Sequence, residues 1–347
     1  MLGYTAKRKS VYNCGLKDCH ISLGCCLSTD ASPTSPLAAW AQLVRLPNVF
    51  TVLADVGAAF LLVAHGPQPA GRFVVVLLAG VALYWGGMIL NDVFDVQQDI
   101  EERPSRPIPA GHIGLVSAKW AGWGLLLAGV VLSAVSGYLP AADHPTTWLP
   151  AAVGIGLAIM IVAYDGPLKK TLLAAASMGS CRVLSFLLGA APCIDLAAGP
   201  PFFPKYVIAI SLGFGIYIMG ITTMAKYEAT GGPNPNLGTG LLVTIIGSAV
   251  LAFAPSTAVG NIAFRIDPGR HFPILIGLIA FPVILRGLRL QGDPSPAKIQ
   301  DTIRAGVLTI IPLAAAFALL GAGRLWGLIV FSLVVPAILL AMRLRVT

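Results

Sequence analysis

The chain has 347 residues, of which 56% are hydrophobic and 11% are charged, and its mean hydropathy is +0.81. A soluble domain carries about 25% charged residues, so this composition excludes a water-soluble globular protein. The net charge of +8 does not indicate a nucleic-acid partner, because the basic residues sort by loop as the positive-inside rule expects. The sequence therefore predicts an all-α, polytopic transmembrane bundle in one domain.

Residues 1–36 are predicted to form a disordered or poorly ordered tail, followed by a transmembrane domain over residues 37–347. Four of the six cysteines fall in this tail, but their spacing matches no zinc site. Residues 28–36 are rich in Ser, Thr and Pro, which is typical of a linker. We assign no chemical role to the tail.

Ten apolar segments follow the tail, and each is long enough to cross the hydrocarbon core as a helix. Small residues, above all glycine, are frequent inside them and predict close helix packing. The segments are 48–65, 72–92, 118–138, 148–164, 172–192, 206–226, 238–256, 272–290, 303–321 and 325–343.

The basic residues divide unequally between the two sides of this predicted bundle. All but five of the 23 Lys and Arg residues fall on the side that holds both termini. Because positively charged loops stay in the cytoplasm, we expect both termini and the motif-bearing loops described below to face the cytoplasm. The five exceptions are Arg72, Lys205, Arg265, Arg270 and Arg324.

The strongest local signal is an acidic cluster directly after the second apolar segment. At 100° per residue, Asp92, Asp95 and Asp99 lie within about 60° of one another on one helix face. Carboxylates this close repel one another unless a cation lies among them. All-oxygen ligands suit Mg²⁺, which takes one or two protein carboxylates and completes its shell with water and phosphate. The cluster therefore predicts a catalytic magnesium site, and a solvated acidic turn is the alternative.

The order Asn91-Asp-x-x-Asp-x-x-x-Asp, followed by Arg103-Pro-x-Arg106-Pro, resembles the first aspartate-rich motif of the UbiA superfamily of intramembrane prenyltransferases. The closest resemblance is to the subgroup called EboC, and it extends to Arg45-Leu-Pro-Asn48 upstream. It implies a bundle of usually nine spans, which leaves nine or ten open here. It also implies that Asn48, Asn91, Arg103 and Arg106 bind the substrate diphosphate through their polar side chains.

A second polar stretch, Tyr164-Asp165-Gly-Pro-Leu-Lys169-Lys170, ends the fourth apolar segment. Superfamily members carry a Tyr followed by a Lys at the corresponding helix end, which implies substrate binding by Tyr164 and by Lys169 or Lys170. The alternative is that both lysines are topology anchors. Asp165 is expected to pair with Lys169 or with Arg182. Asp165 and Asp55 are the two candidates to accept a proton from the acceptor during catalysis.

Two charged residues fall deep inside apolar segments. Arg182 lies about ten residues into the fifth segment, where a buried guanidinium needs an anion, supplied by a substrate phosphate or by Asp165. We therefore predict that Arg182 binds substrate. Asp55 lies about two turns into the first segment, and it either lines the site or pairs with a neighbouring helix.

The sixth segment ends where the superfamily places its second aspartate-rich motif, but here Lys226 occupies an expected aspartate position and Glu228 is the remaining carboxylate. Both residues are predicted to act in catalysis. In one interpretation Lys226 neutralises the diphosphate in place of a second metal, and Glu228 orients it. In the other, ionisation is impaired and the protein binds lipid without turning it over.

Together these motifs predict Mg²⁺-dependent transfer of a prenyl group from an allylic prenyl diphosphate to an unidentified aromatic or lipid-like acceptor, with release of pyrophosphate. The predicted partners are the diphosphate, a hydrophobic acceptor and the bilayer. One alternative is an isoprenoid-binding pseudoenzyme in a pathway complex, suggested by the altered second motif. A small-molecule transporter is another, suggested by ten spans with charged residues inside them. The acceptor, the prenyl length and the oligomeric state are not specified by any residue.

Overall fold

The computed structural model describes residues 35–142, 144–200, 202–226, 235–260 and 262–344. The chain divides into two units, 1–32 and 33–347, and every described residue belongs to the second. The predicted tail lies outside the described residues up to position 34. Helix α1 starts at Pro36, and the Ser35 hydroxyl caps it by accepting a hydrogen bond from the Ala38 N–H at 3.2 Å.

All regular elements in the described ranges are helices, which confirms the predicted all-α fold. In chain order they are α1 (Pro36–Leu43), η1 (Leu46–Asn48), α2 (Val49–Ala64), α3 (Ala70–Phe94), α4 (Val96–Glu102), α5 (Leu115–Tyr138), α6 (Leu149–Ala163), η2 (Tyr164–Leu168), α7 (Ala174–Ala190), η3 (Ala191–Cys193), η4 (Leu196–Ala198), α8 (Lys205–Ala225), α9 (Pro235–Phe253), η5 (Ala254–Thr257), α10 (His271–Leu290), α11 (Pro296–Leu308), α12 (Ile310–Ala322), α13 (Arg324–Ser332) and α14 (Val334–Leu344).

Ten helical segments of the described chain are long and apolar enough to cross a membrane, and each overlaps one predicted segment. The ninth runs from Pro296 to Ala322 and starts seven residues before its predicted start. Its first turns form the amphipathic helix α11, whose charged residues kept them out of the predicted apolar segment. Breaks divide the last two segments at Thr309 and Leu333. Pro312 and Pro336 lie just beyond these breaks, and each lacks the N–H that would continue the helical ladder.

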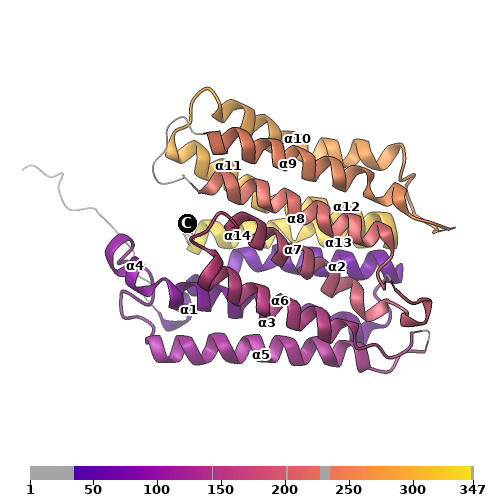
Figure 1. Ribbon diagram of the computed structural model, residues 1–347, viewed down its shortest axis with the longest axis horizontal. Helices are drawn as coiled ribbons and strands as arrows, with labels where there is room; N and C mark the ends of the chain where they lie inside the picture. The colour runs from indigo at the N-terminus through magenta and orange to yellow at the C-terminus, as the bar shows by residue number, and fades with distance from the viewer. Residues whose placement is uncertain (1–34, 143, 201, 227–234, 261, 345–347) are drawn as a thin grey trace, which may run out of the picture. The chain divides into compact units, whose positions relative to one another are not determined.

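Helix α2 lies at the centre of the packing. It contacts α3, α7 and α12, so the C-terminal half of the chain returns to the first span (Figure 1). Residues 54–62 of α2 are all buried. Two large apolar core clusters meet at this helix, and both include residues of α2 and α7. One continues through α3, α5 and α6, and the other continues through α8 to α12.

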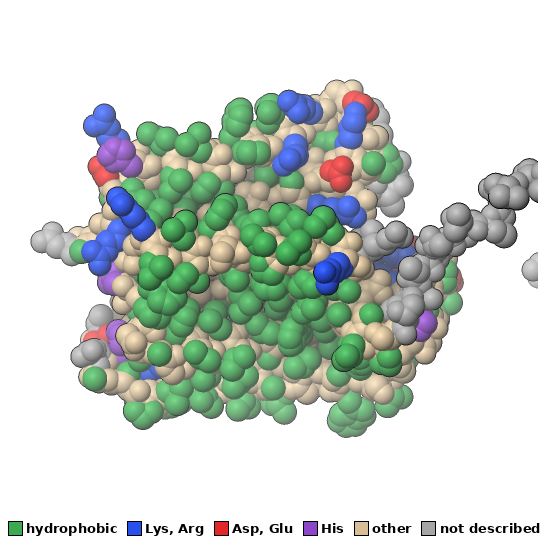
Figure 2. Space-filling model, turned by 180° about the vertical axis from the view of Figure 1, so that it is seen from behind, with side chains coloured by type: hydrophobic (Ala, Val, Ile, Leu, Met, Phe, Trp, Pro, Cys, Tyr) green, Lys and Arg blue, Asp and Glu red, His purple; other side chains and the backbone are tan. Residues whose placement is uncertain are grey.

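The outward face of the bundle is apolar. On α5, Val116, Trp120 and Leu127 follow one helix face, and Trp120 is 77% exposed. Hydrophobic side chains cover the middle of the surface in Figure 2, and charged side chains gather mainly toward the two ends of the helices. A surface of this kind is stable in lipid and not in water. The protein is an integral, multi-pass membrane protein.

A buried arginine hydrogen-bonds to the loops at the end of the bundle opposite the acidic cluster. Arg72, on the first turn of α3, is 1% exposed and donates hydrogen bonds to four backbone carbonyls. Because a buried donor without a partner costs free energy, these bonds stabilise the α5–α6 connection and η3 against α3. The acceptors are the carbonyl oxygens of Leu139 (2.9 Å), His144 (3.2 Å), Pro145 (3.0 Å) and Pro192 (2.7 Å).

Candidate active site at the end of helix α3

The acidic motif lies where α3 ends and α4 begins. Helix α3 ends at Phe94, and Asp95 takes φ −87° and ψ 0°, outside the helical region, before α4 starts. The i to i−4 hydrogen bonds continue through this turn, with the Asp95 N–H donating to the Asn91 carbonyl (3.1 Å) and the Asp99 N–H to the Asp95 carbonyl (2.9 Å). This turn separates Asp95 from Asp92 and Asp99, which the sequence predicted on one helix face. Asp95 consequently has a different partner from the other two aspartates.

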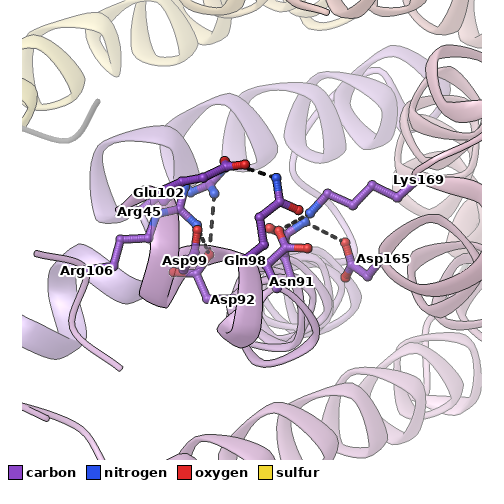
Figure 3. A network of polar contacts seen from close by, with 10 residues as sticks. Arg45, Asn91, Asp92, Gln98, Asp99, Glu102, Arg106, Asp165 and Lys169 are labelled. Atoms are coloured by element: carbon purple, nitrogen blue, oxygen red, sulfur yellow. Dashed lines mark hydrogen bonds and ion pairs between the residues drawn. The ribbon is translucent and has the colours of Figure 1, made fainter. Parts of the chain in front are cut away.

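Arg106 joins Asp92 and Asp99. Its Nη1 atom lies 3.2 Å from Asp92 Oδ1 and 2.7 Å from Asp99 Oδ2, so the two carboxylates face one cationic nitrogen (Figure 3). Both carboxylates are buried, at 5% and 3% exposure. Arg45 Nη2 adds a longer ion pair to Asp92 Oδ1 at 3.6 Å. The backbone of Arg45 has φ +47°, which is unusual for a residue with a side chain and is a form of strain that clusters at functional sites.

Asp95 and Asp165 belong to a second group beside the first. Lys169 forms an ion pair with Asp95, and Asn91 Nδ2 donates a hydrogen bond to Asp165 Oδ1 at 2.9 Å (Figure 3). Asp165 is 4% exposed. Asp165 accepts its hydrogen bond from Asn91, whereas the two predicted partners form their ion pairs elsewhere, Lys169 with Asp95 and Arg182 with Asp55. Asn91 joins the two groups, since it is adjacent to Asp92 in α3.

A π-helical turn, η2, accommodates the spacing between Tyr164 and the two lysines. It covers Tyr164–Leu168 and takes one residue more per turn than an α-helix. Of the two lysines, Lys169 reaches Asp95 in the cluster, whereas Lys170 is exposed. Tyr164 is half-buried at the start of the turn and interacts electrostatically with Asp165 and Arg45. The bulge thus turns one lysine and one carboxylate toward the end of α3.

A third group lies deeper in the bundle, between α2 and α7. Arg182 forms an ion pair with Asp55, which is completely buried. Its Nη2 atom also lies 3.3 Å from the Thr51 hydroxyl, and Ser185 donates to the second Asp55 oxygen at 3.3 Å. The anion that Arg182 needs is therefore Asp55, from the neighbouring helix, and not Asp165.

Several predicted residues lie outside these groups. Arg103 and Lys226 are exposed, and no interaction recorded for the described residues connects them to the cluster. Glu228 lies outside the described residues. Asn48 is half-buried at the start of α2, beside the Tyr84 hydroxyl.

The carboxylates fit a shared magnesium–phosphate site better than a metal site made of protein alone. Among the described residues, no three Asp, Glu, His or Cys side chains gather closely enough to hold a metal. Asp92 and Asp99 nevertheless converge on one cationic atom, Arg106 Nη1. Mg²⁺ commonly takes one or two protein carboxylates, with water and substrate phosphate as its other ligands. In such a site the pair would supply oxygen ligands, at the position that the Arg106 cation occupies here.

Tyr84 is a neighbour of the site that sequence reasoning missed. Its hydroxyl is buried beside Arg45 and Arg182, and it has no partner with hydrogen-bond geometry among the described atoms. The spacing contains a signal, because Tyr84 precedes Asn91 by seven residues and so lies on the same face of α3. An apolar segment with a tyrosine on the face of its own polar motif is a candidate for a site lining.

These features define a class: a multi-pass helical membrane protein with carboxylate and guanidinium groups buried together at one end of its spans. The family model described as "UbiA prenyltransferase family" matches residues 49–305, which is more than half of the chain. The chain belongs to the UbiA prenyltransferase family.

Individual relatives support the same fold. A digeranylgeranylglyceryl phosphate synthase of Metallosphaera sedula is 39% identical over 133 residues, which is 38% of this chain and only 42% of the relative. The enzyme of the same name from Methanothermobacter thermautotrophicus is 29% identical over 266 residues, 71% of this chain and 86% of the relative. A solved UbiA homologue from Archaeoglobus fulgidus, bound to DMAPP and Mg²⁺, is 15% identical with a TM-score of 0.51, covering 84% and 99% of the two chains.

Proposed function

We propose that this protein transfers a prenyl group from an allylic prenyl diphosphate to a hydrophobic acceptor inside the membrane, in a Mg²⁺-dependent reaction that releases pyrophosphate. The observation that carries the proposal is the arrangement of Asp92 and Asp99 on one cationic atom, Arg106 Nη1, in a buried position at a helix end. A UbiA homologue bound to DMAPP and Mg²⁺ supports the choice of substrate and metal. We further propose that this end of the bundle faces the cytoplasm, and the EboC-like subgroup stays a prediction.

The difficult charge in this reaction develops on the departing pyrophosphate, so catalysis requires fixed cations around it. Asp92 and Asp99, with Asp95 nearby, would hold Mg²⁺, which supplies Lewis-acid stabilisation of the leaving group. Arg106 and Lys169, which pair with these carboxylates in the structure, would donate to phosphate oxygens of the bound diphosphate. Asn91 donates its hydrogen bond to Asp165, and Arg45 contacts Asp92 from the turn between α1 and η1.

For the remaining predicted residues we propose supporting roles in substrate binding and catalysis. Asn48 and Tyr164, which are half-buried, would contact the substrate directly, and Arg182 would act from the deeper group, where it is paired with Asp55. Arg103, Lys170 and Lys226 are exposed and Glu228 lies outside the described residues, and for these four we propose the roles that the sequence predicts.

The test uses purified protein in lipid nanodiscs, with Mg²⁺ and radiolabelled geranylgeranyl diphosphate, and measures pyrophosphate release. We expect Asp92→Asn to lower the rate by about 100-fold or more, because the neutral amide weakens the metal site. The matched control is Asp267→Asn, an exposed aspartate in the α9–α10 connection, which should release pyrophosphate at the wild-type rate.

Wild-type turnover in Asp92→Asn would remove the metal role from this residue. Saturable binding of the diphosphate without release by the wild-type protein would instead favour the isoprenoid-binding pseudoenzyme. Absence of both binding and release would contradict the proposal altogether.

A further inference from the structure

One oxygen of the Asp165 carboxylate is buried and has no hydrogen-bond partner in the described part of the chain. Oδ1 accepts the 2.9 Å hydrogen bond from Asn91, whereas Oδ2 has no partner. Leaving a buried acceptor unpaired costs about 1–3 kcal/mol, and each case in a native fold calls for an explanation. A donor from a bound molecule would satisfy this oxygen.

The surroundings hold Asp165 in place without occupying Oδ2. The Asn91 amide fixes one oxygen from α3, and η2 fixes the backbone. The nearest ammonium, Lys169, is already paired with Asp95. Arg45 acts on Asp165 only as a longer-range charge. Oδ2 is therefore a rigid acceptor next to the proposed diphosphate site. Asp165 forms no hydrogen bond or ion pair with Asp92, Asp95 or Asp99.

The polarity of the position selects the group that would bind there. Lys169 and Arg45 place positive charge near Asp165, and Asp95 places negative charge there, but an acceptor carboxylate or phosphate set directly against Oδ2 has no proton to donate to it. A neutral hydroxyl would instead donate its proton to Oδ2.

We infer that Asp165 is the catalytic base for the prenyl acceptor, and that the acceptor reacts through a neutral hydroxyl group; this inference rests on the proposed function. The carbon–oxygen bond of the allylic diphosphate breaks, and its electron pair leaves with pyrophosphate. The acceptor oxygen forms a new bond to the allylic carbon. Its proton passes to Asp165 Oδ2, so that an ether and a neutral carboxylic acid result. The acid then returns the proton to water.

The experiment separates transfer from ionisation in the full-length protein. Nanodisc samples receive Mg²⁺ and radiolabelled geranylgeranyl diphosphate, alone or with a hydroxyl probe, either octadecylglycerol ether or dodecylphenol. Without a probe, water captures the allylic cation as geranylgeraniol, so pyrophosphate release reports ionisation. Formation of the labelled ether reports transfer. We expect Asp165→Asn to release pyrophosphate within about threefold of wild type, because ionisation needs no base for the acceptor. Ether formation should fall by about 100-fold or more, the usual contribution of a general base.

Three controls make the result specific. Asp195→Asn changes an exposed helix-capping aspartate to an equally good cap and should alter neither step. The O-methylated probes lack the proton and should give no ether. Asp165→Ala should lose transfer and regain part of it in sodium formate, which supplies a carboxylate to the vacated space.

Ether formation by Asp165→Asn within about threefold of wild type would overturn the inference. So would equal loss of both steps in a variant with an unchanged melting temperature, or transfer by the wild type to neither hydroxyl probe while release continues. A wild-type protein that releases no pyrophosphate at all would instead refute the proposed prenyltransferase activity.

Discussion

At the scale of single residues, the buried charges of this protein are neutralised in pairs across different helices. Asp55 on α2 and Arg182 on α7 are the deepest of these pairs. An ion pair in a low-dielectric interior gains strong attraction but loses the hydration of both ions, so the pair together is close to neutral in free energy. Removing one partner leaves the other charge buried without compensation. Each residue therefore depends on the other for its place in the bundle.

We predict that Asp55→Leu and Arg182→Met each lower the free energy of unfolding by about 3–5 kcal/mol, whereas the double variant costs much less than either single change. The measurement is equilibrium unfolding in detergent micelles as a double-mutant cycle. The exposed pair of Asp293 and Lys298 is the control, and its removal should have no measurable effect. Additive losses in the Asp55 and Arg182 cycle would contradict this coupling.

At the scale of helices, glycine sets how closely the central spans approach. Gly189 of α7 faces the backbone of α2, and a Cβ atom at this position would lie 2.2 Å from the Val56 carbonyl oxygen. The obstruction is backbone, which cannot rotate away as a side chain can. Small residues at such contacts allow membrane helices to pack through their backbones. The α2–α7 contact also carries Asp55 and Arg182, so its spacing determines the geometry beside the site.

Gly189→Ala should destabilise the fold by about 1–3 kcal/mol through overpacking. Gly124→Ala in α5 is the matched change, because no neighbouring atom lies within 4 Å of its Cβ position, and it should leave thermal stability unchanged or slightly higher. Thermal unfolding in one detergent compares the two variants. Equal melting temperatures for both would show that α7 can move away from α2 at little cost.

At the scale of the whole molecule, the number of spans decides which loops share a side of the membrane. Ten spans bring α1 and the end of α14 to one side, and these two helices are in contact (Figure 1). The acidic motif follows the second span and is therefore on that side too. Because the same loops carry the excess of basic residues, we predict that this side faces the cytoplasm.

Labelling with a membrane-impermeant maleimide tests this arrangement in a background whose six cysteines are replaced by alanine. Ser105→Cys, in the exposed segment after α4, should react only in inside-out vesicles. Thr146→Cys, in the exposed α5–α6 connection, should react in intact cells. Reaction of both from the same side would refute the ten-span topology, and a reversed pattern would refute the orientation.

The sequence by itself determined the class of fold and the location of the acidic cluster. Membrane spans depend on the length of apolar runs, which is a local property of the chain, and the ten segments followed from it. The spacing of Asp92, Asp95 and Asp99 is also local, and it placed the acidic cluster at the end of the second span. The resemblance to a known family depended on the same short motif.

The partners of these residues were decided only by the tertiary structure. Asn91 and Asp165 are 74 positions apart, and Asp55 and Arg182 are 127 apart, so their pairing depends on which helices pack together. The π-turn selected Lys169 over Lys170, because one additional residue in a turn changes which side chain faces the site. Apolar runs specify that helices cross the bilayer, but the packing of one helix against another specifies which charges meet.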